Sequence, residues 1–181
     1  MSMTSPLRIG SGGYSLLEVL VALVIISIGV IGIAAMQAAA LAGTHTSQTE
    51  SIAANEARSL ADAMLANPAF WDGGPAPTSS VFVTAGPTIT GSTALAANPA
   101  CASGNNCSPS DMAAFDLRNW ATEYFQQVPN ATKAAVSCNT TNPPVCTIQL
   151  IWTQKATVGT NAGTQSAATP TTVTYTLVNQ F

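Results

Sequence analysis

The sequence contains very little charge. Only 7% of its 181 residues are Asp, Glu, Lys or Arg, against about 25% in ordinary soluble domains. The basic residues are few and scattered along the chain: Arg8, Arg58, Arg118, Lys133 and Lys155. No basic patch is available to neutralise phosphates, so we expect no direct contact with nucleic acid. A solvent-exposed domain of this chain must instead be covered by Thr, Ser, Asn, Gln and Ala.

Catalytic and metal-binding motifs are also missing. The single histidine, His45, excludes a multi-histidine metal site, and a Ser-His-Asp triad is not expected. The sequence has no Walker loop, H-E-x-x-H or G-x-S-x-G motif. Asp111 and Asp116 are five positions apart, so they fall on different faces of a helix and are interpreted as solvated acids. We therefore predict a protein that is not an enzyme and that holds no cofactor and no metal.

Four cysteines form two close pairs in the sequence, Cys101 with Cys107 and Cys138 with Cys146. Four cysteines allow three connectivities, and the sequence alone does not choose among them. Proximity favours the disulfides Cys101–Cys107 and Cys138–Cys146. The alternative of a four-cysteine zinc site lacks the usual C-x-x-C spacing. Disulfides indicate an oxidising compartment such as the bacterial periplasm.

One long apolar segment, residues 19–42, contains no charge and directly follows Glu18. About 20 apolar residues are enough to cross a bilayer as a helix. A secretory signal peptide would use Arg8 as its positive start and the alanines of residues 38–42 as its cleavage site. However, its apolar core would span only about 7–15 residues, and Glu18 interrupts its beginning. A plain single-pass anchor does not explain this costly carboxylate either.

The segment 13–20, Gly-Tyr-Ser-Leu-Leu-Glu-Val-Leu, resembles the processing site of type IV pilins and of the pseudopilins of type II secretion. The resemblance implies that a prepilin peptidase cleaves between Gly13 and Tyr14 and that Tyr14 is N-methylated, although Phe is more usual at this position. It also implies that Glu18 pairs with the N-terminal amine of a neighbouring subunit during assembly. Such a pair at 4 Å contributes about 4 kcal/mol at an effective dielectric constant of 20. Glu18 would thereby set the register in which subunits dock.

The run from Leu20 to Gln37 is similar to the PilV-type minor pilins in particular, through Ser27-Ile28-Gly29 and Met36-Gln37. The similarity implies a minor pilin that joins a type IV pilus, at its tip or in a priming complex, and promotes assembly. Its implied partners are other minor pilins, the major pilin, the prepilin peptidase and an inner-membrane assembly platform. The chain would span the inner membrane with its head in the periplasm, and would reach the cell surface in the pilus. Two alternatives stay open: a minor pseudopilin of a type II secretion system, and a membrane-anchored periplasmic binding protein unrelated to filaments.

The expected organisation has three parts. Residues 1–13 form a prepilin leader, residues 14–42 the transmembrane and filament-core half of a helix, and residues 43–181 a periplasmic head that includes the rest of that helix. An apolar stripe with helical spacing continues the helix into the head: Ala53, Ala57, Leu60, Ala61 and Met64. Polar residues, Glu56 among them, are expected mostly on the opposite face. Asn67-Pro68 ends the helix.

The remainder of the head predicts a small sheet and one more helix. Irregular chain with a short strand at 81–83 leads to a helix that begins at Ser108 and ends before Pro129. The aromatic residues of this helix, Phe115, Trp120 and Tyr124, are expected in the core. Strands are predicted at 134–137, 146–152 and 172–178 from their alternating pattern. The expected fold is α+β, a type IV pilin fold with a long N-terminal helix packed on a small antiparallel sheet and an extra short helix.

Overall fold

The computed structural model describes residues 13–72, 76–97, 101, 106–154 and 170–180. The chain divides into two compact units, Met1–Gly43 and Thr44–Phe181, which are treated separately below. Residues 1–12, with Arg8 and nearly all of the predicted leader, lie outside the described residues.

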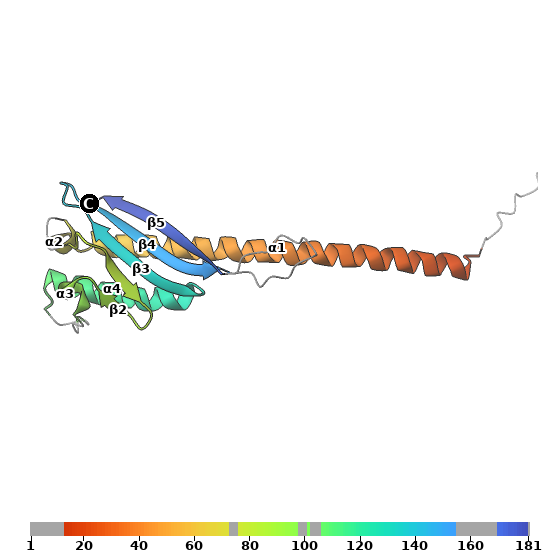
Figure 1. The fold of residues 1–181 in the computed structure, drawn as a ribbon, viewed down its shortest axis with the longest axis horizontal. Helices are drawn as coiled ribbons and strands as arrows, with labels where there is room; N and C mark the ends of the chain where they lie inside the picture. Colours follow the sequence, from red (N-terminus) through yellow and green to blue (C-terminus); the bar gives the residue numbers. More distant parts are fainter. Residues whose placement is uncertain (1–12, 73–75, 98–100, 102–105, 155–169, 181) are drawn as a thin grey trace, which may run out of the picture. The chain divides into compact units, whose positions relative to one another are not determined.

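The described part of the first unit contains residues 13–15 and the beginning of helix α1, which runs without interruption from Leu16 to Leu65 (Figure 1). Its large apolar side chains are all at least half exposed. An 18-residue window of this helix reaches a mean hydropathy of 2.9, with none of it buried. The helix therefore has the length and composition to cross a membrane.

The second unit contains a five-stranded antiparallel sheet with the order β2-β1-β3-β4-β5. Its strands are β1 (Val81–Thr84), β2 (Thr88–Thr90), β3 (Ala131–Cys138), β4 (Val145–Gln154) and β5 (Thr171–Gln180). The four predicted strands are all present, and each is longer than expected. The three-residue strand β2 was not predicted; it pairs with β1 and leads to Gly91, whose φ of +95° favours glycine.

Three further helices complete this unit: α2 (Pro68–Trp71), α3 (Thr93–Ala96) and α4 (Pro109–Gln127). One face of the sheet packs with α4 and with the part of α1 that belongs to the second unit, and together they form a single apolar core. Every residue of the predicted stripe on α1 lies in this core: Ala53, Ala57, Leu60, Ala61 and Met64. The α+β fold predicted from the sequence, a long N-terminal helix packed on a small antiparallel sheet, is confirmed.

Two predictions about burial are wrong in part. Trp120 and Tyr124 are buried as expected, but Phe115 is only half-buried. Glu56, expected on the solvent side of α1, is only 6% exposed. The cause is α4, which covers this turn: the Nε1 of Trp120 donates a hydrogen bond of 2.8 Å to the Glu56 carbonyl oxygen. Burial, with a smaller contribution from the charge of Glu123, raises the pKa of the Glu56 carboxyl above its ordinary value.

Candidate functional site at the N-terminal junction

The beginning of α1 is fixed by a side-chain cap. The Glu18 N–H donates to the Ser15 hydroxyl oxygen at 3.2 Å and to the Ser15 carbonyl oxygen at 3.1 Å. The Val19 N–H donates to the same carbonyl at 3.3 Å. These bonds satisfy donors that a helix start otherwise leaves free. The sequence prediction missed this role of Ser15, although Ser-Leu-Leu-Glu is the S-x-x-E pattern typical of a helix N-terminus.

The peptide bond between Gly13 and Tyr14 lies just outside the capped helix. Neither residue belongs to a helix or a strand, and the Tyr14 side chain is 82% exposed. A Cβ atom placed on Gly13 would have no heavy atom within 4 Å. Since a peptidase binds its substrate as extended chain, an open, non-helical bond here is suited to cleavage, whereas a bond inside the helix would first need unwinding.

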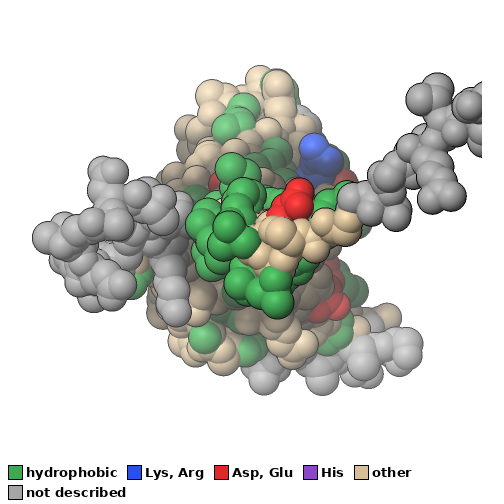
Figure 2. Space-filling model, turned by 90° about the vertical axis from the view of Figure 1, so that its right-hand side faces the viewer, with side chains coloured by type: hydrophobic (Ala, Val, Ile, Leu, Met, Phe, Trp, Pro, Cys, Tyr) green, Lys and Arg blue, Asp and Glu red, His purple; other side chains and the backbone are tan. Residues whose placement is uncertain are grey.

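Tyr14, just before the helix, and Glu18, in its first turn, lie beside the same hollow. Together with Val19, Ala22, Leu23 and Ile26 they line a shallow hollow in the surface of the helix. Figure 2 shows hydrophobic side chains at the end of α1 nearest the viewer, with an acidic side chain among them. Glu18 is the only Asp, Glu, Lys or Arg between residues 9 and 49. The carboxylate is thus presented in an almost wholly apolar surface, close to the positive end of the helix dipole.

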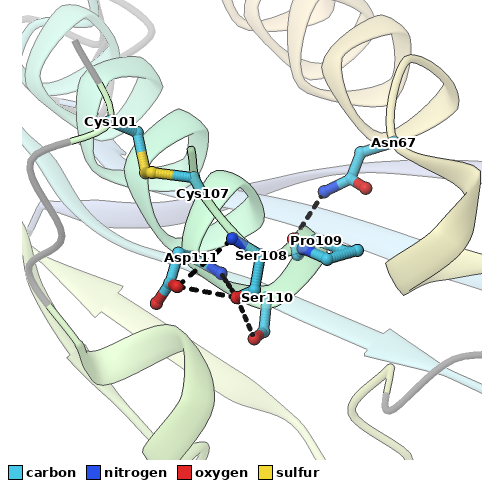
Figure 3. Close-up of a disulfide and its surroundings, with 7 residues drawn as sticks. All are labelled: Asn67, Cys101, Cys107, Ser108, Pro109, Ser110 and Asp111. Carbon is cyan, nitrogen blue, oxygen red and sulfur yellow. Dashed lines mark hydrogen bonds between the residues drawn. A yellow bond between two sulfur atoms is a disulfide. The ribbon is translucent and has the colours of Figure 1, made fainter. Parts of the chain in front are cut away.

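In the second unit, Thr44–Phe181, which is called the head below, disulfides join Cys101 to Cys107 and Cys138 to Cys146. The first disulfide is followed directly by the capping box that begins α4 (Figure 3). The Ser108 hydroxyl oxygen accepts a hydrogen bond from the Asp111 N–H at 3.2 Å, and the Asp111 carboxylate accepts from the Ser108 N–H at 3.4 Å. Asp111, interpreted from the sequence as a solvated acid, is partly exposed and also caps the first turn of α4.

Asn67 and Tyr124 provide two of the polar contacts that attach α4 to the rest of the head. The Asn67 side-chain amide donates to the Pro109 carbonyl oxygen at 2.7 Å, which ties the segment between α1 and α2 to the first turn of α4 (Figure 3). The Tyr124 hydroxyl accepts from the Ile151 N–H and donates to the Ile151 carbonyl oxygen, both at 3.1 Å. Burial raises the pKa of Tyr124 to about 12. The second contact fixes α4 to β4.

Arg118 acts as a clamp that the sequence prediction did not foresee. Its guanidinium donates to the carbonyl oxygens of Pro87 and Ala97 at 3.0 and 2.7 Å, and also to that of Ala96. Two of these acceptors are at the end of α3, where carbonyl groups lack partners within the helix. The clamp binds α3 and the turn before β2 to α4. No local sequence pattern would reveal it, because its acceptors are 21 to 31 residues away.

No group of three or more His, Cys, Asp and Glu side chains that could hold a metal ion occurs in the described part of the chain. A cavity of about 300 Å³ lies beside the turn between β3 and β4, and its lining includes one acidic residue, Asp72, among Thr and Asn side chains. The residues of the N-terminal junction contribute nothing to it.

Comparison with known protein families gives a match at the N-terminal end of the chain. Residues 9–34 match the family described as the prokaryotic N-terminal methylation motif. No curated protein and no solved structure matches the chain. The match supports a type IV pilin-like chain and indicates a type IV pilin or pseudopilin that is a substrate of prepilin peptidase. The apolar helix α1 fits a protein of this kind that is anchored in the inner membrane.

Proposed function

We propose that this chain is a minor pilin of a type IV pilus, that it enters the tip or the priming complex, and that it promotes pilus assembly. The observation that carries the proposal is the beginning of α1. This exposed apolar part of the helix is capped at Ser15, and Glu18 is its only Asp, Glu, Lys or Arg before Glu50. In the membrane, lipid covers this helix. In the pilus, the helices of other subunits replace the lipid, so a single element serves both states.

Processing creates the second charge that assembly needs. Cleavage between Gly13 and Tyr14 removes the leader and leaves a free amine on Tyr14, which is then methylated and keeps its positive charge. The location of this bond just before the capped helix supports the assignment. The apolar segment has to remain attached, and the cut therefore falls in front of it, on the cytoplasmic side where Arg8 holds the leader.

Glu18 then receives the amine of a neighbouring subunit. A carboxylate among apolar helices is costly when unpaired, and so is an amine, so two subunits dock most favourably in the register that pairs them. The Ser15 cap supports this role because it holds the turn that carries Glu18 in one conformation. An apolar helix without the carboxylate would have little preference for one docking register over another.

The head supplies the surface for specific partners, namely other minor pilins and the major pilin. The prepilin peptidase and the inner-membrane assembly platform act before these contacts form. A periplasmic head agrees with the two disulfides, since the periplasm is oxidising. The minor, PilV-type role within the pilus is supported by the similarity of residues 20–37.

The competing function is that of a minor pseudopilin in type II secretion, whose N-terminal segment is processed and assembled in the same way. Deleting the gene separates the two. We expect the deletion strain to lose surface pili while it secretes exoproteins normally, and the wild-type gene supplied in trans to restore the pili. Normal piliation together with defective secretion would refute the pilus assignment and favour the pseudopilin.

A further inference from the structure

Strand β5 forms a long free edge of the sheet. All ten of its residues pair with β4, from Thr171 opposite Gln154 to Gln180 opposite Val145, and no described strand pairs with its other side. In an antiparallel ladder alternate residues direct their backbone groups away from the partner strand. About five N–H groups and five carbonyl groups of β5 therefore point outward without a strand to receive them.

This edge lacks the features that usually prevent pairing with another chain. Protective edges carry Lys, proline, a bulge or an inward-pointing charge, or are very short. The sequence of β5 contains no charge, no proline and no glycine, and its register with β4 is continuous. The opposite edge of the sheet, β2, is only three residues long. The two edges thus differ sharply in their capacity to accept a strand.

The side chains of β5 are also incompletely covered. Val173, Tyr175 and Leu177 pack against the core but stay partly exposed, because no strand among the described residues flanks them on the outer side. The alternate positions are exposed: Thr172, Thr174, Thr176 and Val178. A further strand would complete the burial of Val173, Tyr175 and Leu177. It would also continue the exposed face that the alternate positions form. Its backbone would at the same time satisfy the outward N–H and carbonyl groups.

We propose that the β5 edge binds an extended strand of another protein chain in the assembled fibre. The structure sets the chemistry of this strand. It is about ten residues long and free of charge, because β4 and β5 both lack charged residues. Its side chains alternate, with apolar residues beside Val173, Tyr175 and Leu177 and small polar residues beside the threonines.

The occupant is a different protein rather than a second copy, and this step rests on the proposed function. Two copies that pair β5 with β5 in antiparallel fashion are related by a two-fold axis perpendicular to the strands, which turns one head end over end. Subunits of a fibre are instead related by rotation about the fibre axis and translation along it. Like edges then do not meet, and β2 is too short to pair along the whole of β5.

Hydrogen exchange tests the edge directly on the mature full-length protein. It is measured on the tagged protein in detergent micelles and on the same protein recovered from purified pili after quenching. We expect the outward amides of β5 to exchange readily in micelles and at least about 100-fold more slowly in pili, as expected for amides in a paired strand. Exchange that stays fast in pili would overturn the proposal. Slow exchange already present in micelles would also overturn the proposal. If that slow exchange rate does not change with protein concentration, the chain covers its own edge. If it does change with concentration, two copies pair.

A pair of lysine substitutions provides a matched control. Val178 and Thr147 lie opposite each other on the outer face of the sheet, Val178 on the edge strand and Thr147 one strand inward. We expect Val178→Lys to lower the amount of the subunit in purified pili by about tenfold, because a lysine on an edge strand opposes pairing with another strand. Thr147→Lys should leave this amount near the wild-type level. Equal effects of the two substitutions would contradict a role for the edge.

Two further readouts keep the test independent of folding and of the proposed function. Unchanged exchange of the β3 and β4 amides in micelles shows that each variant is folded. An unprocessed N-terminus in the wild-type protein would refute the proposed function. Fast exchange of the β5 amides in an otherwise normal pilus would refute only the proposal that β5 binds a strand.

Discussion

The backbone N–H of Glu18 donates a hydrogen bond of 3.2 Å to the hydroxyl oxygen of Ser15. The residue that we expect to receive a neighbour's charge therefore lies in a capped first turn, three positions after the cap. A local bond thus prepares the geometry of a contact between subunits. The predictions below follow from this relationship and from the contacts that build the head.

Removing the cap should loosen the first turn. Ser15→Ala is expected to destabilise the helix start by about 1 kcal/mol, which is typical of a lost N-cap. The amides of Glu18 and Val19 should then exchange faster in micelles, and incorporation into pili should fall severalfold. Ser27→Ala is the matched control, because the Ser27 hydroxyl bonds to the Leu23 carbonyl oxygen within the helix and caps nothing. An equal loss of incorporation in both variants would show that the cap has no special role.

Removing the carboxylate should affect assembly and leave processing intact. Glu18→Ala is expected to be cleaved and methylated nearly as in the wild type, because the scissile bond lies outside the helix. Its amount in purified pili should fall at least about tenfold, since the docking register loses an ion pair of several kcal/mol. Glu50→Ala, which removes an exposed acid farther along the same helix, is the control. Wild-type incorporation of Glu18→Ala would count against pairing with the amine.

Glu56 should make the stability of the head depend on pH. Its folded-state pKa is raised above the ordinary 4.5 by burial and by Glu123, so the folded carboxyl keeps its proton where the unfolded chain has released it. The resulting destabilisation is absent below the unfolded value, grows as the pH rises through the window between the two values, and is complete above it.

The substitution Glu56→Gln removes this charge and should raise the free energy of unfolding at pH 7 by about 1 kcal/mol. The gain should disappear at pH values below 4.5. Denaturant titration in micelles, followed by the fluorescence of the three tryptophans, measures it, since Trp71, Trp120 and Trp152 are all buried in the head. Glu123→Gln should give a smaller gain, because the charge of Glu123 is the lesser cause. A pH-independent effect of Glu56→Gln would contradict the assignment.

Tyr124 should stabilise the contact between α4 and β4. Tyr124→Phe keeps the ring that stacks on Trp120 but leaves the Ile151 N–H without its side-chain partner. The Ile151 carbonyl loses one of its two hydroxyl donors and keeps the other, Thr132. The loss should be about 1–2 kcal/mol in the free energy of unfolding, measured by the same titration. Tyr175→Phe, in the partly exposed row of β5, should cost less. Because the folded pKa of Tyr124 is about 12, the wild type should also lose stability as the pH rises from about 10 to about 12.

The sequence predicted the features of the fold that depend on local patterns. The stripe from Ala53 to Met64 follows the helical period, and β4 and β5 follow the strand period. Whether each segment is a helix or a strand could therefore be predicted without the structure. The ends of α4 were predicted from Ser108 and Pro129 for the same reason. In contrast, β2 has only three residues, too few to show alternation, and its existence depends on its pairing with β1.

Features that depend on distant segments were missed. Burial of Glu56 comes from Trp120, 64 positions away, and the Arg118 clamp depends on carbonyl groups of α3 and of the turn before β2. At the N-terminal junction, Gly13, Tyr14 and Glu18 were found through a local motif. Ser15 was overlooked although its signal was equally local. The roles of these residues in processing and assembly remain predictions.

Mass spectrometry of the mature N-terminus tests the central claim most directly. The protein is purified from membranes of cells with and without the prepilin peptidase. With the peptidase, we predict a chain that begins at Tyr14 and carries one N-methyl group; without it, a chain that retains residues 1–13. An N-terminus at any other residue, or the same N-terminus in both strains, would contradict the account.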